Sequence, residues 1–163
     1  MNGIRQELLH LLVLNYAEQW VPNHIALAQL EHYGDQLIPG LIGCLGDYDS
    51  EIRQLAINLL DEAGLRAEPA LPAVIQLVAD PDRLVRVAAA HCLEKFGPQA
   101  VDAVPFLIPW LQDDNEYIRL LAGITIMRLD PKKRDELMPI VRSASASAHP
   151  MVQGMADDFL NEQ

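Results

Sequence analysis

Residues 71–97 read LPAVIQLVADPDRLVRVAAAHCLEKFG, and the chain contains four versions of this pattern in succession. A proline recurs at steps of 33, 33 and 34 residues: Pro39, Pro72, Pro105 and Pro139. An arginine keeps the same step and is replaced in the fourth version: Arg53, Arg86, Arg119 and then Gln153. The same residue types returning in phase at this period predict a stack of helical repeats.

Each repeat predicts two antiparallel helices. The proline falls in the first turn of the first helix, where its missing N–H costs nothing. The turn Asp80-Pro81-Asp82 ends that helix and caps the second, because an aspartate oxygen accepts hydrogen bonds from the free N–H groups at a helix start. Gly64 and Gly97 stand where the second helix ends and a left-handed residue is favoured.

The aspartate turn and the arginine share one explanation. Stacking is expected to place each turn beside the second helix of the next repeat, so an Asp/Arg ladder across that seam would satisfy buried polar groups and fix the register. Binding of a ligand by these arginines is the alternative. Loss of the arginine at Gln153 fits the end of the stack.

The predicted fold is therefore all-α: an α-solenoid of about five antiparallel helix pairs in a single domain over residues 1–163. Four repeats cover residues 35–66, 67–99, 100–132 and 133–163. Residues 1–34 are less regular, and the helical patterns at Gly3–Tyr16 and Asn23–Tyr33 predict a degenerate pair that caps the stack.

The pattern of proline, Asp-x-Asp, aliphatic-Arg and alanine over residues 35–163 resembles the HEAT-repeat family, in the short bacterial form related to phycobilin-lyase-like repeats. Ankyrin and tetratricopeptide repeats have similar periods, but their signature residues do not occur in this chain. The resemblance implies a superhelix whose second helices line a concave face. It also implies a non-enzymatic protein-binding scaffold, with a bilin lyase or lyase-chaperone subunit as the alternative.

Composition narrows the classes of partner. The formal net charge of −11 disfavours nucleic acid and anionic membrane surfaces, since both repel an acidic protein. A basic protein, or one with an exposed apolar segment, is the expected partner, although acidity that only maintains solubility remains the alternative. Cys44 and Cys92 lie in apolar helical segments and are expected to be buried, reduced thiols, which suits a cytoplasmic protein. The sequence predicts no cofactor, metal or catalytic residue.

The candidate site comes from the positions of each second helix that are expected to face the concave side. Apolar candidates come from the second and third repeats: Leu84, Val87, Tyr117, Leu120, Ile124 and Met127. An acidic flank comes from the first repeat: Glu51, Asp61 and Glu62. Two interpretations remain open, because these apolar side chains either form an exposed binding surface or pack between neighbouring helices.

An inhibitor or immunity-type protein that covers a toxin or enzyme is one concrete form of this function. The last predicted helix adds a second expectation. Its apolar residues have no polar capping repeat after them, which predicts a homo-oligomer or another covering chain: Val152, Met155, Ala156, Phe159 and Leu160.

Overall fold

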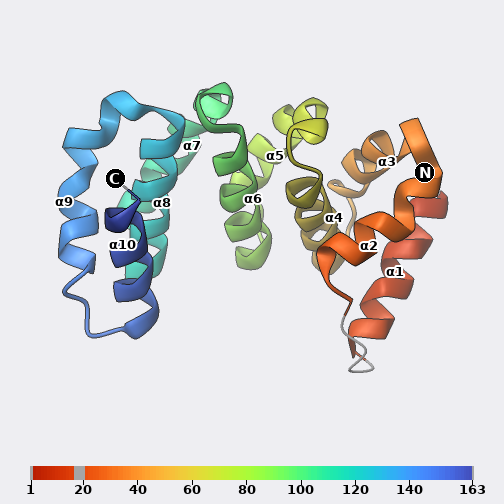
Figure 1. Cartoon of the computed structure of the whole chain (residues 1–163), viewed down its shortest axis with the longest axis horizontal. Helices are drawn as coiled ribbons and strands as arrows, with labels where there is room; N and C mark the ends of the chain where they lie inside the picture. The colour runs from red at the N-terminus through yellow and green to blue at the C-terminus, as the bar shows by residue number, and fades with distance from the viewer. Residues whose placement is uncertain (1, 17–20, 163) are drawn as a thin grey trace. The chain divides into compact units, whose positions relative to one another are not determined.

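The computed structural model describes residues 2–16 and 21–162, and within these ranges it is built from α-helices and short 3-10 helices (Figure 1). The chain divides into two compact units, Met1–Phe96 and Gly97–Gln163. The first unit holds six α-helices: α1 (Asn2–Tyr16), α2 (Asn23–Leu30), α3 (Leu37–Cys44), α4 (Ser50–Ala63), α5 (Leu71–Gln76) and α6 (Arg83–Phe96). The second unit holds four: α7 (Val104–Leu107), α8 (Glu116–Leu129), α9 (Arg134–Ala144) and α10 (Pro150–Asn161).

In the described part of the chain, six 3-10 helices join or extend these elements: η1 (Glu31–Gln36), η2 (Gly64–Ala70), η3 (Leu77–Ala79), η4 (Gly97–Ala103), η5 (Ile108–Gln112) and η6 (Pro131–Lys133). The ten α-helices of the described residues confirm the all-α, repeat-based fold predicted from the proline spacing. The first helices α3, α5 and α7 are short and adjoin 3-10 turns, whereas α9 and the second helices α4, α6 and α8 are longer and continuous.

One central helix organises each unit. In the first unit α4 packs against α2, α3 and α6, and its residues Ile52, Leu59 and Leu60 are fully buried. In the second unit α8 packs against η4, η5, α9 and α10. These contacts bury apolar side chains on several sides of the central helices, which is the main source of their stability.

The turns before the second helices are capped as predicted. The side chain of Asp49 accepts a hydrogen bond from the Glu51 N–H at 2.9 Å, and Asn115 accepts one from the Tyr117 N–H at 2.9 Å. Asp82 accepts from the N–H of Leu84 at 2.8 Å. In the fourth repeat no side chain caps α10, so the loss of the acidic turn there has a local structural consequence.

Glycines end the second helices where the sequence predicts them. Gly64 has φ of 59° and Gly97 has φ of 52°, a region that side chains with a Cβ seldom enter. In the third repeat Asp130 takes this place with φ of −129°, and its carboxylate accepts a hydrogen bond from the Lys132 N–H. The second helices therefore end in two ways, at a glycine with positive φ in the first two repeats and at an aspartate with negative φ in the third.

One expectation about the prolines is wrong. Pro72 and Pro105 occupy the first turns of α5 and α7, but Pro139 lies inside α9, which begins five residues earlier at Arg134. The turn at Asp130 and Pro131 starts the helical path early, so Pro139 enters a helix that is already formed. Its ring cannot supply the usual N–H to the carbonyl four residues before it.

Candidate functional site

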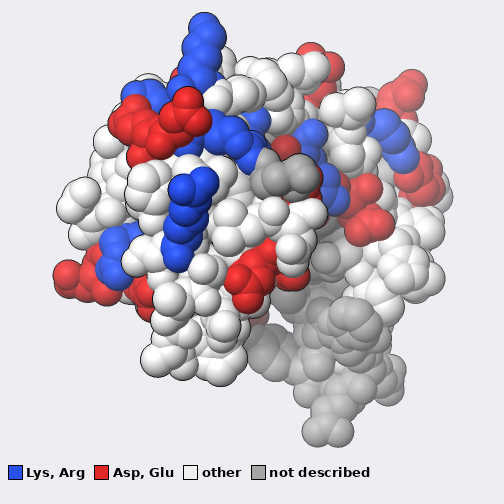
Figure 2. Space-filling model, turned by 60° about the vertical axis from the view of Figure 1, so that its left-hand side comes forward, with Lys and Arg blue, Asp and Glu red and all other residues white. Residues whose placement is uncertain are grey.

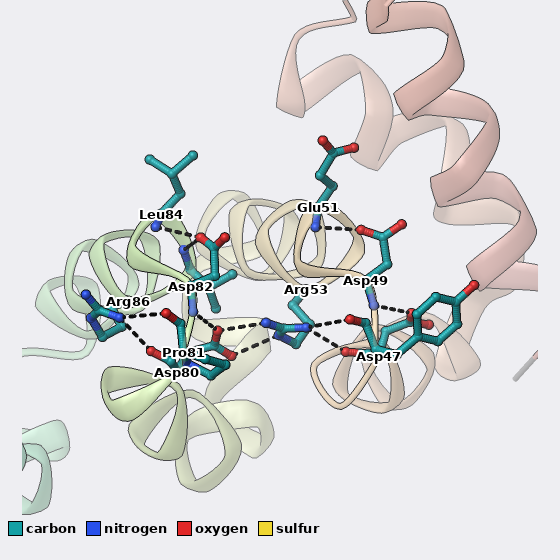
Figure 3. A network of polar contacts seen from close by, with 11 residues as sticks. Asp47, Asp49, Glu51, Arg53, Asp80, Pro81, Asp82, Leu84 and Arg86 are labelled. Carbon is teal, nitrogen blue, oxygen red and sulfur yellow. Dashed lines mark hydrogen bonds and ion pairs between the residues drawn. The ribbon is translucent and has the colours of Figure 1, made fainter.

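A buried ion pair between Arg53 and Asp80 joins the first two repeats, and both residues belong to the repeated sequence pattern (Figure 3). Arg53 Nε donates to Asp80 Oδ2 at 2.8 Å, and Arg53 Nη2 donates to Asp80 Oδ1 at 2.7 Å. The remaining nitrogen, Nη1, donates to the carbonyls of Asp47 and Tyr48 in the preceding turn. The predicted Asp/Arg ladder is therefore present here, but its expected direction is wrong, because the turn of the second repeat lies beside the second helix of the preceding repeat. Arg53 thus links two successive turns.

The contact between the arginine Nη1 and the carbonyls of the turn before its own helix recurs in the second and third repeats. Arg86 Nη1 donates to the carbonyls of Asp80 and Pro81, and Arg119 Nη1 donates to those of Asp113 and Asp114. Each arginine thus closes its own turn through backbone oxygens. This contact is structural and occupies Nη1 of each arginine.

Hydrogen bonding shifts the titration of the turn carboxylates. The Arg5 side chain, with a smaller contribution from the Asp49 N–H, holds the pKa of Asp47 below its ordinary value. The N–H groups of Val85 and Leu84 do the same for the pKa of Asp82. These aspartates are therefore ionised in the folded protein under neutral conditions.

The outward sides of α4 and α6 form the surface that best matches the predicted site, and we call it the α4–α6 face. It comprises the exposed or half-buried positions at helical spacing on the two packed helices: Glu51, Gln54, Asn58, Glu62, Leu84, Val87, His91 and Lys95. Leu84 is 60% exposed, and Figure 3 shows its side chain and that of Glu51 projecting on the same side. An ion pair of 3.4 Å between Lys95 Nζ and Asp61 Oδ2 joins the far ends of the two helices.

The third-repeat candidates behave differently. Leu120, Ile124 and Met127 are at most 2% exposed, so the prediction that they belong to an exposed surface is wrong. They lie on α8, which η4, η5, α9 and α10 surround in the second unit. Packing is therefore the correct alternative for these three residues, while Tyr117 at the start of α8 is half-buried.

The last helix also exposes less apolar surface than expected. Val152, Ala156 and Phe159 are buried, and α10 packs on both α8 and α9. Met155 and Leu160 are half-buried. Homo-oligomerisation through this helix stays a prediction, with a smaller apolar surface to support it.

Charges of both signs are mixed on the face that Figure 2 draws, where lysine and arginine side chains lie beside aspartates and glutamates. Among the described residues, no group of three or more histidine, cysteine, aspartate or glutamate side chains could hold a metal ion. No helix in the described part of the chain is both long and apolar enough to cross a membrane.

A mixed pocket of about 390 Å³ opens in the second unit between η5, α8 and α9. Its polar lining comes from Gln112, Glu116, Arg119 and Ser143, and its apolar lining includes Leu111, Leu120 and Ile140. The repeat pattern alone gave no sign of a cavity here, because the pocket depends on how α9 lies on α8.

Comparisons with known proteins agree with this geometry. The chain matches the family of HEAT repeats over residues 38–128 and 71–156. It belongs to the HEAT-repeat family. No curated protein matches it in sequence. The crystal structure of an engineered protein from the Northeast Structural Genomics Consortium is similar with a TM-score of 0.59 and 19% identity. That likeness covers 86% of this chain but 66% of the engineered protein, just under two thirds of its length, and it supports the fold alone.

A feature of α1 outside the matched HEAT repeats was missed from the sequence. Arg5 Nε and Nη2 donate to the two carboxylate oxygens of Asp47, as Arg53 does to Asp80. The pair Ile4-Arg5 has the same aliphatic-Arg pattern as Ile52-Arg53, and this was the signal available. With α1 packed on α3 and α4, Arg5 extends the ladder of the HEAT repeats by one step toward the N-terminus.

Proposed function

We propose that this HEAT-repeat protein is a non-enzymatic scaffold that binds a protein partner through the α4–α6 face. HEAT repeats commonly act as scaffolds for protein interactions, since stacked repeats present extended surfaces. The observation that carries the proposal for this face is Leu84. It is a large apolar side chain, 60% exposed, in the first turn of α6, whereas other apolar residues of this helix, such as Val85 and Leu93, are buried.

The charges around Leu84 indicate the chemistry of the partner. Glu51 and Glu62 are exposed on the same face, and Asp61 is half-buried beside them. The chain as a whole has a formal net charge of −11. A basic segment would be attracted to this face, and an apolar residue within it would cover Leu84 and the half-buried Val87. The acidic side chains would mainly affect the rate of association, and Leu84 the rate of dissociation.

Inhibition of an enzyme or toxin by covering its surface is one form that such binding would take. A bilin lyase or lyase-chaperone subunit is the alternative role. The proposal that the α4–α6 face binds a protein does not depend on the choice between these roles.

The experiment compares matched exposed leucines. Wild type, Leu84→Asp and Leu65→Asp are immobilised and used to capture proteins from the native cell lysate, followed by mass spectrometry. Leu65 lies on η2 and is 68% exposed, so its substitution changes charge and exposed apolar area in the same way at a site away from the face. We expect Leu84→Asp to lose the captured partner and Leu65→Asp to retain it.

A charge-reversal pair tests the acidic flank. Glu51→Lys should reduce capture at low salt, whereas Glu68→Lys, which alters an exposed glutamate on η2, should not. Circular dichroism of all variants verifies that the fold is retained. Equal capture by wild type and Leu84→Asp would remove the α4–α6 face as the binding surface.

A further inference from the structure

The pocket between η5, α8 and α9 contains Arg119, which does not have, among the described residues, the carboxylate partner that Arg5 and Arg53 have. We infer that this pocket binds a carboxylate group carried on a short apolar stem, with Arg119 as the residue that receives it. The inference concerns the second unit alone and is independent of the proposed partner for the α4–α6 face.

Arg53 provides the template for this site. Its Nη1 closes its own turn, and its Nε and Nη2 receive both oxygens of the Asp80 carboxylate from the next repeat. Arg119 repeats the first half, with Nη1 at 2.6 Å from the Asp113 carbonyl and 3.0 Å from that of Asp114. Among the described residues, no carboxylate accepts a hydrogen bond from its Nε or Nη2.

The reason is a single residue in the following turn. Asp80 lies six residues before Arg86, and the equivalent position six residues before Gln153 is Ser147. Their turns match in detail, because Asp80 Oδ1 accepts a hydrogen bond from the Asp82 N–H and Ser147 Oγ accepts one from the His149 N–H. Serine thus preserves the turn but offers no carboxylate to the arginine.

The side chain of Ser147 makes a hydrogen bond with Glu116 instead of Arg119. Its hydroxyl donates to Glu116 Oε2 at 2.8 Å, which links the turn to the first residue of α8. Serine is also shorter than aspartate, and Arg119 itself lines the pocket of about 390 Å³. A carboxylate entering there could take two parallel hydrogen bonds from the guanidinium fork.

The rest of the lining defines the ligand further. Leu111, Leu120, Pro139 and Ile140 form apolar wall, which suits a short hydrocarbon stem behind the carboxylate. Gln112 and Ser143 add neutral hydrogen-bonding groups. Glu116 also lines the pocket and carries the same sign of charge as the ligand, so it lowers the affinity without removing the arginine fork.

The test uses four small probes, which show whether a carboxylate is required and whether it comes from a peptide side chain or from a free acid. N-acetyl-glutamate N-methylamide represents an acidic side chain of a peptide, and butyrate represents a free carboxylic acid. N-acetyl-glutamine N-methylamide and butyramide are their neutral counterparts. Titrations are followed by the backbone amide resonances of Leu120, Ser143 and Ala144 in the folded protein.

We expect saturable shifts with at least one of the two carboxylates and with neither neutral counterpart. A response to the glutamate derivative alone identifies a peptide source, and a response to butyrate alone identifies a free acid. Saturable binding of the neutral probes with equal affinity, or no saturable shift with any probe, would overturn the inference.

Two variants place the binding at Arg119. Glu116→Ser with Ser147→Asp reproduces the residues at Ser50 and Asp80 in the earlier repeats and leaves the net charge unchanged. Its new carboxylate should occupy the fork and weaken probe binding by roughly tenfold or more. Glu116→Ser alone is the control and should bind as well as wild type or more tightly. Wild-type affinity in the double variant would refute the assignment to Arg119.

Discussion

Arg53 and Asp80 form two parallel hydrogen bonds across 27 residues of sequence, and both side chains are buried. A buried carboxylate that loses its partner pays its full desolvation cost. We therefore expect Arg53→Leu to lower the free energy of unfolding by about 3–5 kcal/mol, measured by urea denaturation at neutral pH.

The double variant Arg53→Leu with Asp80→Asn isolates the cause. Asparagine can still accept the hydrogen bond from the Asp82 N–H but carries no charge, so the double variant should be more stable than Arg53→Leu alone. Arg66→Leu is the control, because it breaks an exposed pair with Glu31, and solvent-exposed ion pairs contribute little to stability. If Arg53→Leu costs no more than Arg66→Leu, the ladder does not stabilise the stack.

Acid should weaken the fold through the turn carboxylates. The pKa values of Asp47 and Asp82 are lowered in the folded state, so the unfolded chain binds protons at these sites more readily. Their contribution to stability is complete well above the unfolded pKa of about 3.9 and is lost as the pH falls through the lower folded values. The urea concentration at the unfolding midpoint should therefore decrease as the pH is lowered from about 5 to about 3.

A variant checks the sign of this effect. Asp82→Asn retains a side-chain oxygen for the Leu84 N–H but cannot titrate, so its urea midpoint should change less with pH than that of wild type. Glu68→Gln alters an exposed glutamate on η2 and serves as the control. A pH dependence of Asp82→Asn as steep as that of wild type would mean that other carboxylates cause the acid sensitivity.

The repeat fold and its seam could be predicted because both depend on local spacing. Proline, aspartate and arginine at a fixed spacing indicate the turns and an Asp/Arg pair between successive repeats. The direction of the pairing, from the Asp80 turn back to Arg53, depends on how the repeats stack and was not predicted. Gly64 and Gly97 could be assigned for the same reason, since a helix end is a local event. Arg5 was predictable in principle from the Ile4-Arg5 pair.

The exposure or burial of the candidate site residues could not be predicted from their position in the repeat alone. Val87 and Leu120 occupy the same repeat position, one residue after the arginine, yet Val87 is half-buried and Leu120 is fully buried. The difference comes from the elements packed on α8, which sequence position does not specify. The available warning was that α8 is apolar on nearly every side, and a helix of that kind is normally buried.

This difference predicts opposite outcomes for two similar substitutions. Leu120→Asp introduces a charge at a site with 0% exposure, so it should unfold the second unit or lower the melting temperature sharply. Leu84→Asp changes a side chain that is 60% exposed and should leave far-ultraviolet circular dichroism and the melting temperature nearly unchanged. A native-like melting curve for Leu120→Asp would contradict the burial of this residue.

The two cysteines should be unreactive until the chain unfolds. Burial, with a smaller contribution from the nearby Asp61 carboxylate, raises the pKa of Cys92 to about 12, and burial is also the main cause of the raised pKa of Cys44. At pH 8 only about one Cys92 thiol in ten thousand is then a thiolate, and the thiolate is the reactive species. Iodoacetamide should therefore modify both residues at the rate of unfolding, and rapidly in urea. Asp61→Asn removes only the secondary cause and should leave Cys92 protected, whereas fast modification of Cys92 in protein with native circular dichroism would show that its thiol is accessible in the folded state.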